Sequence, residues 1–176
     1  MDALRFRRAG LADLDAIVAL VERCFRGEAS RGGWTTEADL LDGQRTDRDE
    51  VAELVGGAAT RIVLAERGAE RELVGCVMLK DEGSAAYFGM LSVLPGLQGS
   101  GLGRAILDEA ERVARDELGR REMRMRVFVQ RTPLIEWYER RGYRRTGETE
   151  PFPYGDPRFG LPKRDDLVFA VMKKGL

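Results

Sequence analysis

Three glycines within five positions, between an apolar run and an amphipathic one, restrict this chain more than any other feature of its sequence. The run LSVLPGLQGSGLGRAILDEA (residues 91–110) begins like a strand, passes through Gly99, Gly101 and Gly103, and continues with apolar residues at helical spacing. Glycine lets the backbone turn sharply, so that several main-chain N–H groups converge where the helix begins. These N–H groups and the helix dipole suit a phosphate or pyrophosphate. A strand, a glycine loop and a helix in this order indicate an α/β protein.

Three familiar glycine motifs do not fit this loop. A Walker phosphate loop needs Lys-Ser or Lys-Thr after its last glycine, where this chain has Arg104 and Ala105. The dinucleotide-binding pattern GxGxxG needs a third glycine at the position of Arg104. A nucleophile elbow around Ser100 needs glycine in place of Gln98, and the chain has no histidine to act as its base. The pattern that fits is Q-x-x-G-x-G, a pyrophosphate cradle for coenzyme A, and a plain structural turn is the alternative.

Hydrophobic periodicity predicts the elements around this loop. Helices are predicted over residues 11–25, 35–43, 47–57, 102–118 and 133–141, with Thr35 or Thr36 capping the second and Asp47 the third. Strands are predicted over 4–9, 60–66, 72–80, 85–94, 123–129 and 165–174, with another strand beginning at Tyr143. The loop 149–164 holds four of the six prolines, and its aromatic residues argue against disorder. Because no repeat or linker interrupts the pattern, we expect one α/β domain with a mixed sheet over residues 1–176.

Charge argues against nucleic acid as a partner. The chain has 29 Lys and Arg against 30 Asp and Glu, a net charge of −1, which gives no electrostatic basis for sequence-independent binding. The arginine clusters at 120–126 and 140–145 are interpreted as solvated faces that also contact the ribose phosphate of coenzyme A. Binding of tRNA or the ribosome is the alternative for these clusters.

The absence of histidine excludes further chemistry. With Cys24 and Cys76 as its only cysteines, the chain offers neither a disulfide framework nor a four-ligand zinc site, and we expect no metal. We expect both cysteines to be buried as small apolar residues. The N-terminal residues lack the apolar core of a signal peptide, and no run reaches the ~20 apolar residues of a membrane span. A cytoplasmic protein without a membrane partner is expected.

Two segments of the chain resemble the GCN5-related N-acetyltransferase (GNAT) family. Residues 91–107 are similar to its acetyl-CoA loop, whose signature positions are occupied by Gln98, Gly101 and Gly103. Residues 132–148, TPLIEWYERRGYRRTGE, resemble its later helix–strand segment, in the expected order and spacing. The resemblance covers about the whole chain except 151–164. It implies the acyl-CoA N-acyltransferase fold, an α/β fold with a central, twisted, mostly antiparallel sheet of about seven strands flanked by about four helices.

The resemblance implies an acetyl-CoA-dependent N-acetyltransferase in which a primary amine attacks the acetyl group directly within a ternary complex. The main chain of residues 91–93 would pair with the pantetheine arm and point an N–H at the thioester carbonyl. Tyr138 would protonate the leaving thiolate, with a packing role as the alternative. Arg104 would add a charge contact to the pyrophosphate, or lie exposed on the helix. The residues implied to contact the coenzyme are Leu91, Ser92, Val93, Gln98, Gly99, Ser100, Gly101, Leu102, Gly103, Arg104 and Arg131.

Two positions depart from the family pattern. Arg131 stands where the family often has an asparagine that contacts the pantetheine, and arginine cannot accept a hydrogen bond. That contact must differ or move to Gln130. Arg126 stands where some members carry a carboxylate that acts as base. These departures favour the alternative of a non-catalytic acyl-CoA-binding regulatory module, and an acyltransferase with another donor, such as succinyl-CoA, also stays open.

The acceptor side is less well determined by the sequence. In the family, the region of residues 26–45 forms a variable lid over the acceptor, which we expect to be a small-molecule or peptide amine. The base is unassigned: water chains are one option, and the carboxylate candidates are Glu28, Glu37, Asp39 and Glu150. Trp34 would wall the pocket or pack in the core. We predict Glu28, Trp34 and Glu37 as acceptor-binding residues. Acidic lid residues, with Asp156, favour a cationic amine, and a homodimer is a family-level expectation.

Overall fold

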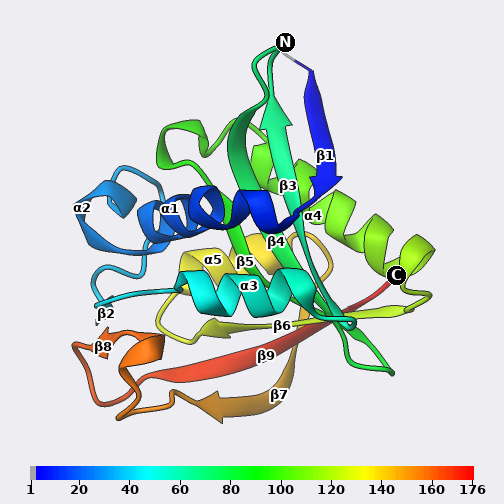
Figure 1. Cartoon of the computed structure of the whole chain (residues 1–176). Coiled ribbons are helices and arrows are strands. Elements are labelled where there is room, and N and C mark those ends of the chain that lie inside the picture. The colour runs from blue at the N-terminus through cyan, green and yellow to red at the C-terminus, as the bar shows by residue number, and fades with distance from the viewer. Residues whose placement is uncertain (1–2) are drawn as a thin grey trace.

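A seven-stranded sheet forms the centre of the computed structural model, which describes residues 3–176 (Figure 1). In spatial order its strands are β1 (Leu4–Arg8), β3 (Thr60–Arg67), β4 (Glu72–Asp81), β5 (Ala86–Val93), β6 (Glu122–Phe128), β9 (Val168–Gly175) and β7 (Arg144–Pro151). All neighbours are antiparallel except β5 and β6. The short strands β2 (Leu41–Asp42) and β8 (Leu161–Pro162) form a separate pair. The predicted mixed, mostly antiparallel sheet is confirmed.

Helices cover both faces of this sheet. They are α1 (Leu14–Phe25), α2 (Gly27–Ser30), α3 (Arg48–Gly56), α4 (Leu102–Arg112) and α5 (Thr132–Glu139). Helices α1 and α3 pack on one face, in front of the sheet in Figure 1, and α4 and α5 pack on the other. Successive side chains of β3 point to opposite faces of the sheet. Ile62 and Leu64 pack in the core under α1 and α3, and Val63 and Ala65 pack in the core under α4. The helices predicted over 11–25, 47–57 and 133–141 are confirmed, apart from small shifts at their ends, and the helix predicted over 102–118 runs as α4 to Arg112 and continues as a π-helical stretch over Val113–Glu117.

The helix predicted over residues 35–43 is wrong. Instead of capping a helix, Thr36 Oγ1 accepts a hydrogen bond from the Ala38 N–H, two residues on, at 3.0 Å. Such side-chain bonds to the local backbone compete with helix formation. Leu40 and Leu41 pack with Phe128 and Phe152, and β2 begins at Leu41. Tertiary packing therefore outweighs local propensity here, and α2 forms in the glycine-rich stretch where no helix was predicted.

Several smaller predictions are confirmed. Cys24 and Cys76 are free and buried, 7% and 0% exposed. Asp47 caps α3 through its side chain, which accepts from the Glu50 N–H at 2.8 Å. The loop 149–164 is ordered, with Phe152 buried in the core and the Tyr154 hydroxyl donating to the Arg164 carbonyl at 2.9 Å.

The search for membrane spans and metal sites covers residues 3–176. Within this range, no helix is long and apolar enough to cross a bilayer. The same residues contain no cluster of three or more His, Cys, Asp or Glu side chains that could hold a metal ion.

Two irregularities open the sheet between β5 and β6. These parallel strands pair only at Ala86–Met123 and Tyr87–Arg124. Beyond that point β5 contains a bulge, because two of its residues, Met90 and Leu91, lie opposite a single residue of β4. Met90 adopts the left-handed backbone conformation, with φ of +52°. As a result, the edge of β5 near Leu91 faces a cavity rather than another strand.

Candidate functional site

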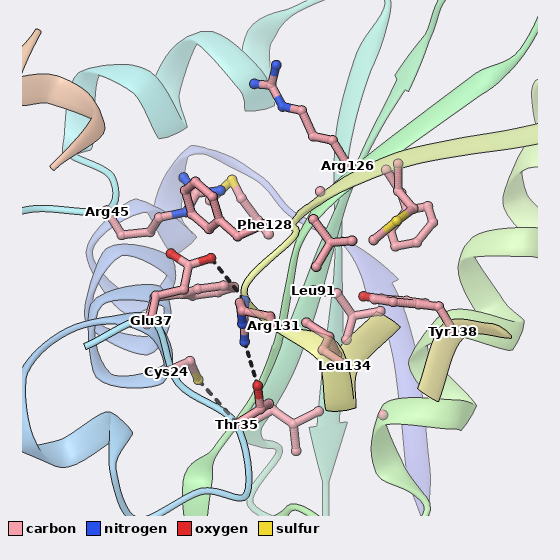
Figure 2. A pocket seen from close by; sticks show the side chains of 18 of the residues that line it. Cys24, Thr35, Glu37, Arg45, Leu91, Arg126, Phe128, Arg131, Leu134 and Tyr138 are labelled. Carbon is pink, nitrogen blue, oxygen red and sulfur yellow. Dashed lines mark hydrogen bonds and ion pairs between the residues drawn. The ribbon is translucent and has the colours of Figure 1, made fainter. Parts of the chain in front are cut away.

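A cavity of about 640 Å³ occupies this opening, and we divide it by the elements that line it. The loop half is lined by the glycine loop, the start of α4 and α5, through Gln98, Gly99, Gly101, Gly103, Arg104, Leu134, Trp137, Tyr138, Arg140 and Arg141. The lid half is lined by residues 25–54, by Tyr87 of β5, by β6, by Phe169 of β9 and by the late loop, with Arg26, Glu37, Arg45, Glu50, Arg126, Phe128, Phe152 and Phe159 among its residues. Figure 2 shows Tyr138 on one side of the cavity and Arg45 and Glu37 on the other.

Unpaired main-chain donors distinguish the loop half. Gly99 and Gly101 have φ of +82° and +88°, a conformation that other residues rarely adopt. The first hydrogen bond of α4 runs from the Ala105 N–H to the Gly101 carbonyl at 3.1 Å. Among the described residues, none accepts a hydrogen bond from the N–H groups of residues 99–104. Converging free N–H groups at a helix N-terminus form a site for an anion.

Gln98 connects the glycine loop to the lid. Its side-chain Oε1 accepts from the Trp34 N–H at 2.9 Å, and its Nε2 donates to the Val93 carbonyl at 3.3 Å. A Cβ on Gly33 would collide with the Gln98 amide, so glycine at that position permits the close approach. Gln98 therefore holds the lid against β5. Its predicted contact with the coenzyme stays a prediction.

Tyr138 combines a buried ring with an available hydroxyl. The residue is 3% exposed, and its ring packs edge-on against Trp137 and Tyr143 at 5.0 and 5.7 Å between centroids. In Figure 2 its hydroxyl points toward Leu91, and within residues 3–176 it has no hydrogen-bond partner. Burial raises the pKa of Tyr138 above its usual value of 10, against the smaller opposing effect of Arg131. The hydroxyl is thus a protonated donor at neutral pH.

The three β5 residues predicted to face the pantetheine differ in their surroundings. Leu91 and Val93 line the cavity, whereas the Ser92 side chain is buried and donates to the Met90 carbonyl at 2.9 Å. The Val93 carbonyl also accepts from Cys24 Sγ at 3.3 Å. The bulge at Met90 and Leu91 thus presents the β5 edge to the space between Tyr138 and the lid.

A buried carboxylate between two arginines forms the centre of the lid half. Glu37, 8% exposed, accepts from Arg26 Nη1 at 2.8 Å and from Arg131 Nη1 at 3.0 Å (Figure 2). Arg131 Nη2 also donates to Thr35 Oγ1 at 2.8 Å. Burial by itself raises the pKa of Glu37, but the charges of Arg131, Arg26 and Arg45 outweigh it and lower that pKa below its ordinary value. Glu37 is therefore an anion that holds two arginines, and it is a weak base.

The cavity brings many of the predicted residues together. From the predicted coenzyme-binding set it is lined by Leu91, Val93, Gln98, Gly99, Gly101, Gly103, Arg104 and Arg131, and from the other predictions by Trp34, Glu37 and Tyr138. Trp34 is 47% exposed, so core packing is not its role. The side chains of Ser92, Ser100 and Leu102 do not line the cavity.

Three of the candidate bases lie elsewhere. Glu28 is 91% exposed at its side chain and pairs with Arg31 at 3.0 Å, and Asp39 pairs with the same arginine at 2.7 Å. Glu150 pairs with Arg126 at 2.7 Å and does not line the cavity. Of the four carboxylates proposed as bases, only Glu37 faces this space in the described part of the chain.

Sequence reasoning missed several lining residues of the lid half. Arg45 belongs to the lid segment, and Glu50, whose carboxylate accepts from the Thr46 hydroxyl at 2.6 Å, belongs to α3. Phe128 and Phe169 stack at 4.2 Å between ring centroids, although they are 41 positions apart in the sequence. Arg45 could have been predicted, because it lies at the end of the lid segment in the sequence. The stack of Phe128 on Phe169 could not, because it depends on the pairing of β6 with β9.

Comparisons with known proteins identify the family and the fold of the chain. The model of the acetyltransferase (GNAT) family matches residues 14–143. A crystal structure of a protein proposed to be a phosphinothricin N-acetyltransferase has a TM-score of 0.71 and 19% identity, covering 99% of each chain. The spermidine/spermine N-acetyltransferase SpeG from Vibrio cholerae has a TM-score of 0.67 and 20% identity over 98% of this chain and 92% of its own. Such structural likenesses establish the fold. No curated protein matches the sequence.

Proposed function

Because this chain belongs to the acetyltransferase (GNAT) family, we propose that it transfers the acetyl group of acetyl-CoA to a primary amine within a ternary complex. One observation carries the proposal: free N–H groups, an open strand edge and a protonated tyrosine hydroxyl meet in one cavity. The whole chain, residues 1–176, is taken to act as a single catalytic domain.

The loop half fits the pyrophosphate of the coenzyme. The N–H groups of residues 99–104 have no protein acceptor among the described residues, and the N-terminus of α4 adds a partial positive charge. A Cβ at Gly99 or Gly101 would meet no protein atom within 4 Å, so there is open space beside both. Arg104 contributes a long-range charge from the surface of the helix.

The chemistry then takes place between Leu91 and Tyr138. The amine nitrogen attacks the thioester carbonyl carbon, the C–S bond breaks, and the thiolate takes the proton of the Tyr138 hydroxyl. The raised pKa of Tyr138 supports this role, because the proton is still present at neutral pH. Main-chain N–H groups of residues 91–93 stabilise the negative charge that develops on the carbonyl oxygen.

Water accepts the proton that the amine loses. Glu37 is poorly suited to that task, because two arginines hold its pKa below the ordinary range and an efficient base needs a pKa near the working pH. We assign it a positioning role for Arg26 and Arg131. The names of the structural neighbours give spermidine, spermine and phosphinothricin as acceptors, and an amine is the class we carry over to this chain.

The test combines binding and turnover. Titration calorimetry with acetyl-CoA measures donor binding, and release of free coenzyme A thiol is followed with a panel of amines, peptides and polyamines, with product mass identifying the acyl group. We expect binding and amine-stimulated release. If acetyl-CoA binds but no acceptor stimulates release, the chain is a binding module, and the proposed function is wrong.

A further inference from the structure

The lid half carries more positive than negative side chains. Its charged lining residues are the arginines Arg26, Arg45, Arg126 and Arg131 and the glutamates Glu37 and Glu50, and of the arginines Arg126 is paired with Glu150 outside the cavity at 2.7 Å. The acidic residues that suggested a cationic acceptor lie outside the cavity and are engaged in ion pairs, since Glu28 and Asp39 share Arg31 and Asp156 pairs with Arg158. The expectation of a negative acceptor pocket is therefore not supported by the structure.

Arg26 keeps buried donors without acceptors. The residue is 6% exposed, and its Nη1 donates to the Phe25 carbonyl and to Glu37 at 3.2 and 2.8 Å. Its Nε and Nη2 are buried and have no hydrogen-bond partner in the described part of the chain, and the same holds for Nε of Arg131. Since these donors are buried, their positive charge is not neutralised by solvent or by further carboxylates. With one glutamate for two guanidinium groups, this cluster keeps one net positive charge.

Arg45 adds a further positive charge with no counterion. No carboxylate of residues 3–176 lies within 4.0 Å of its guanidinium, which lies over the Phe25 ring at 5.3 Å. Its backbone is fixed, because the N–H groups of Arg45 and Thr46 donate to Glu22 Oε1 at 2.6 and 2.8 Å. Figure 2 shows Arg45 on the same side of the cavity as Glu37 and Phe128. A fixed backbone with a free guanidinium is suited to binding an anionic group.

The rest of the lid half is largely aromatic. Phe128 and Phe169 stack on each other, and Phe152 packs edge-on against Tyr154 next to them. The aromatic residues that line this half are Phe25, Tyr87, Phe128, Phe152, Phe159 and Phe169. A ligand that contacts both the rings and the arginines has an apolar body and an anionic group.

We propose that the lid half binds an acceptor that carries a carboxylate beside its primary amine, an amino acid with an apolar side chain rather than a polyamine. This inference rests on the proposed function, since it names the acceptor of that reaction. Arg45 binds the carboxylate, the net positive charge of the Arg26–Glu37–Arg131 cluster stabilises it from below the surface, and the amine points toward Leu91. A carboxylate could also come from the donor, for example from a succinyl group on coenzyme A. The test therefore distinguishes a carboxylate on the acceptor from one on the donor.

The experiment measures binding to protein saturated with coenzyme A, so it does not depend on turnover. Calorimetry compares leucine, methionine and phenylalanine with their carboxamides, and adds phenethylamine and spermidine. At least one free acid is expected to bind about tenfold more tightly than its amide, since a charge-assisted pair contributes roughly 1.5–3 kcal/mol. Arg45→Gln should remove this preference, and Arg45→Lys should restore part of it. Arg48→Gln is the matched control, an exposed arginine of α3 outside the cavity, and should keep the full preference.

Other outcomes would contradict the proposed carboxylate-bearing acceptor. If no free acid binds more tightly than its amide, or if Arg48→Gln matches the loss caused by Arg45→Gln, the carboxylate assignment is wrong. If Arg45→Gln instead weakens only the binding of succinyl-CoA relative to acetyl-CoA, the anion belongs to the donor, and the acceptor assignment is wrong. Acetylation of phenethylamine or spermidine alone would overturn this inference and leave the proposed function intact. Melting curves confirm that each variant is folded.

Discussion

The two halves of the cavity recognise their ligands with different parts of the chain. The loop half uses main-chain N–H groups from one continuous stretch, residues 99–104, with one helix face beside it. The lid half uses whole side chains that come from α1, the lid, α3, β5, β6, β9 and the late loop. A site made from the backbone of one segment can be read from local sequence, whereas a site assembled from distant side chains depends on the tertiary fold.

The halves also differ in how they carry charge. Backbone N–H groups in the loop half offer partial charges, and Arg104 near them is exposed and lies 3.7 Å from Asp108. In the lid half, Arg26, Glu37 and Arg131 bury full charges within hydrogen-bond distance of one another. Burial of a full charge is costly unless a partner compensates it. Substitutions in the lid half should therefore affect folding, and substitutions in the loop half should affect mainly donor binding.

Tyr138→Phe, at the junction of the halves, should have the largest effect. It should lower kcat by about a thousandfold, because general acid catalysis contributes roughly 10²–10⁴-fold. Affinity for acetyl-CoA and stability should hardly change, since the hydroxyl bonds to no described residue. The measurements are steady-state kinetics with several amines and calorimetry with acetyl-CoA. An unchanged kcat would refute the acid role and would make Tyr138 a packing residue of the loop half.

Glu37→Gln tests the buried charges of the lid half. It should lower the free energy of unfolding by about 3 kcal/mol at pH 7, because it leaves two buried arginines without their carboxylate. Urea denaturation measures this, with the exposed Glu28→Gln as the control that should not differ from wild type. Loss of acetyl-CoA affinity in the folded variant, without loss of stability, would show that the halves are not independent in the way we argue.

The same variant has a predicted pH dependence. Because the arginines lower the pKa of Glu37 in the folded state, its contribution is fully present above its ordinary pKa of 4.5. It is lost as the pH falls through the lower folded-state pKa. The difference in stability between wild type and Glu37→Gln should thus stay constant from pH 7 to about pH 5 and shrink in more acidic buffer. A difference that shrinks above pH 5 would contradict the lowered pKa.

The sequence predicts the loop half of the cavity better than the lid half. The strand, glycine loop and helix around Gly101 were predicted, because consecutive residues determine the backbone conformation there. Tyr138 was predicted through the resemblance of a second local segment, residues 132–148, to the GNAT family. The pairing of Glu37 with Arg131, 94 positions apart, has no local signal, and the predicted helix over 35–43 fails because Leu40 and Leu41 pack against distant aromatic rings. The charge of the lid half depends in the same way on ion pairs between distant residues, such as Arg126 with Glu150, that the sequence does not show.

Gly101→Ala tests whether the backbone conformation of the glycine loop is needed for acetyl-CoA binding. Alanine at φ of +88° is strained, and relief of that strain would move the N–H groups away from the pyrophosphate. We expect acetyl-CoA to bind about tenfold more weakly, since an unfavourable backbone conformation costs roughly 1–3 kcal/mol. Gly96→Ala is the control in the same loop, because its φ is not positive and its Cβ would meet open space. Equal losses in the two variants would argue against a specific backbone cradle.

Arg104→Gln should have the smallest effect and tests whether the loop half depends on side-chain charge at all. The Arg104 side chain is 71% exposed, and an exposed charge is screened by water and salt. We expect acetyl-CoA affinity to fall about threefold or less in low salt, and the difference to vanish as ionic strength rises. Calorimetry at two salt concentrations measures it. A loss above about tenfold that persists in high salt would mean that a full charge, rather than the backbone N–H groups, holds the pyrophosphate. In that case the loop half would work by the same principle as the lid half.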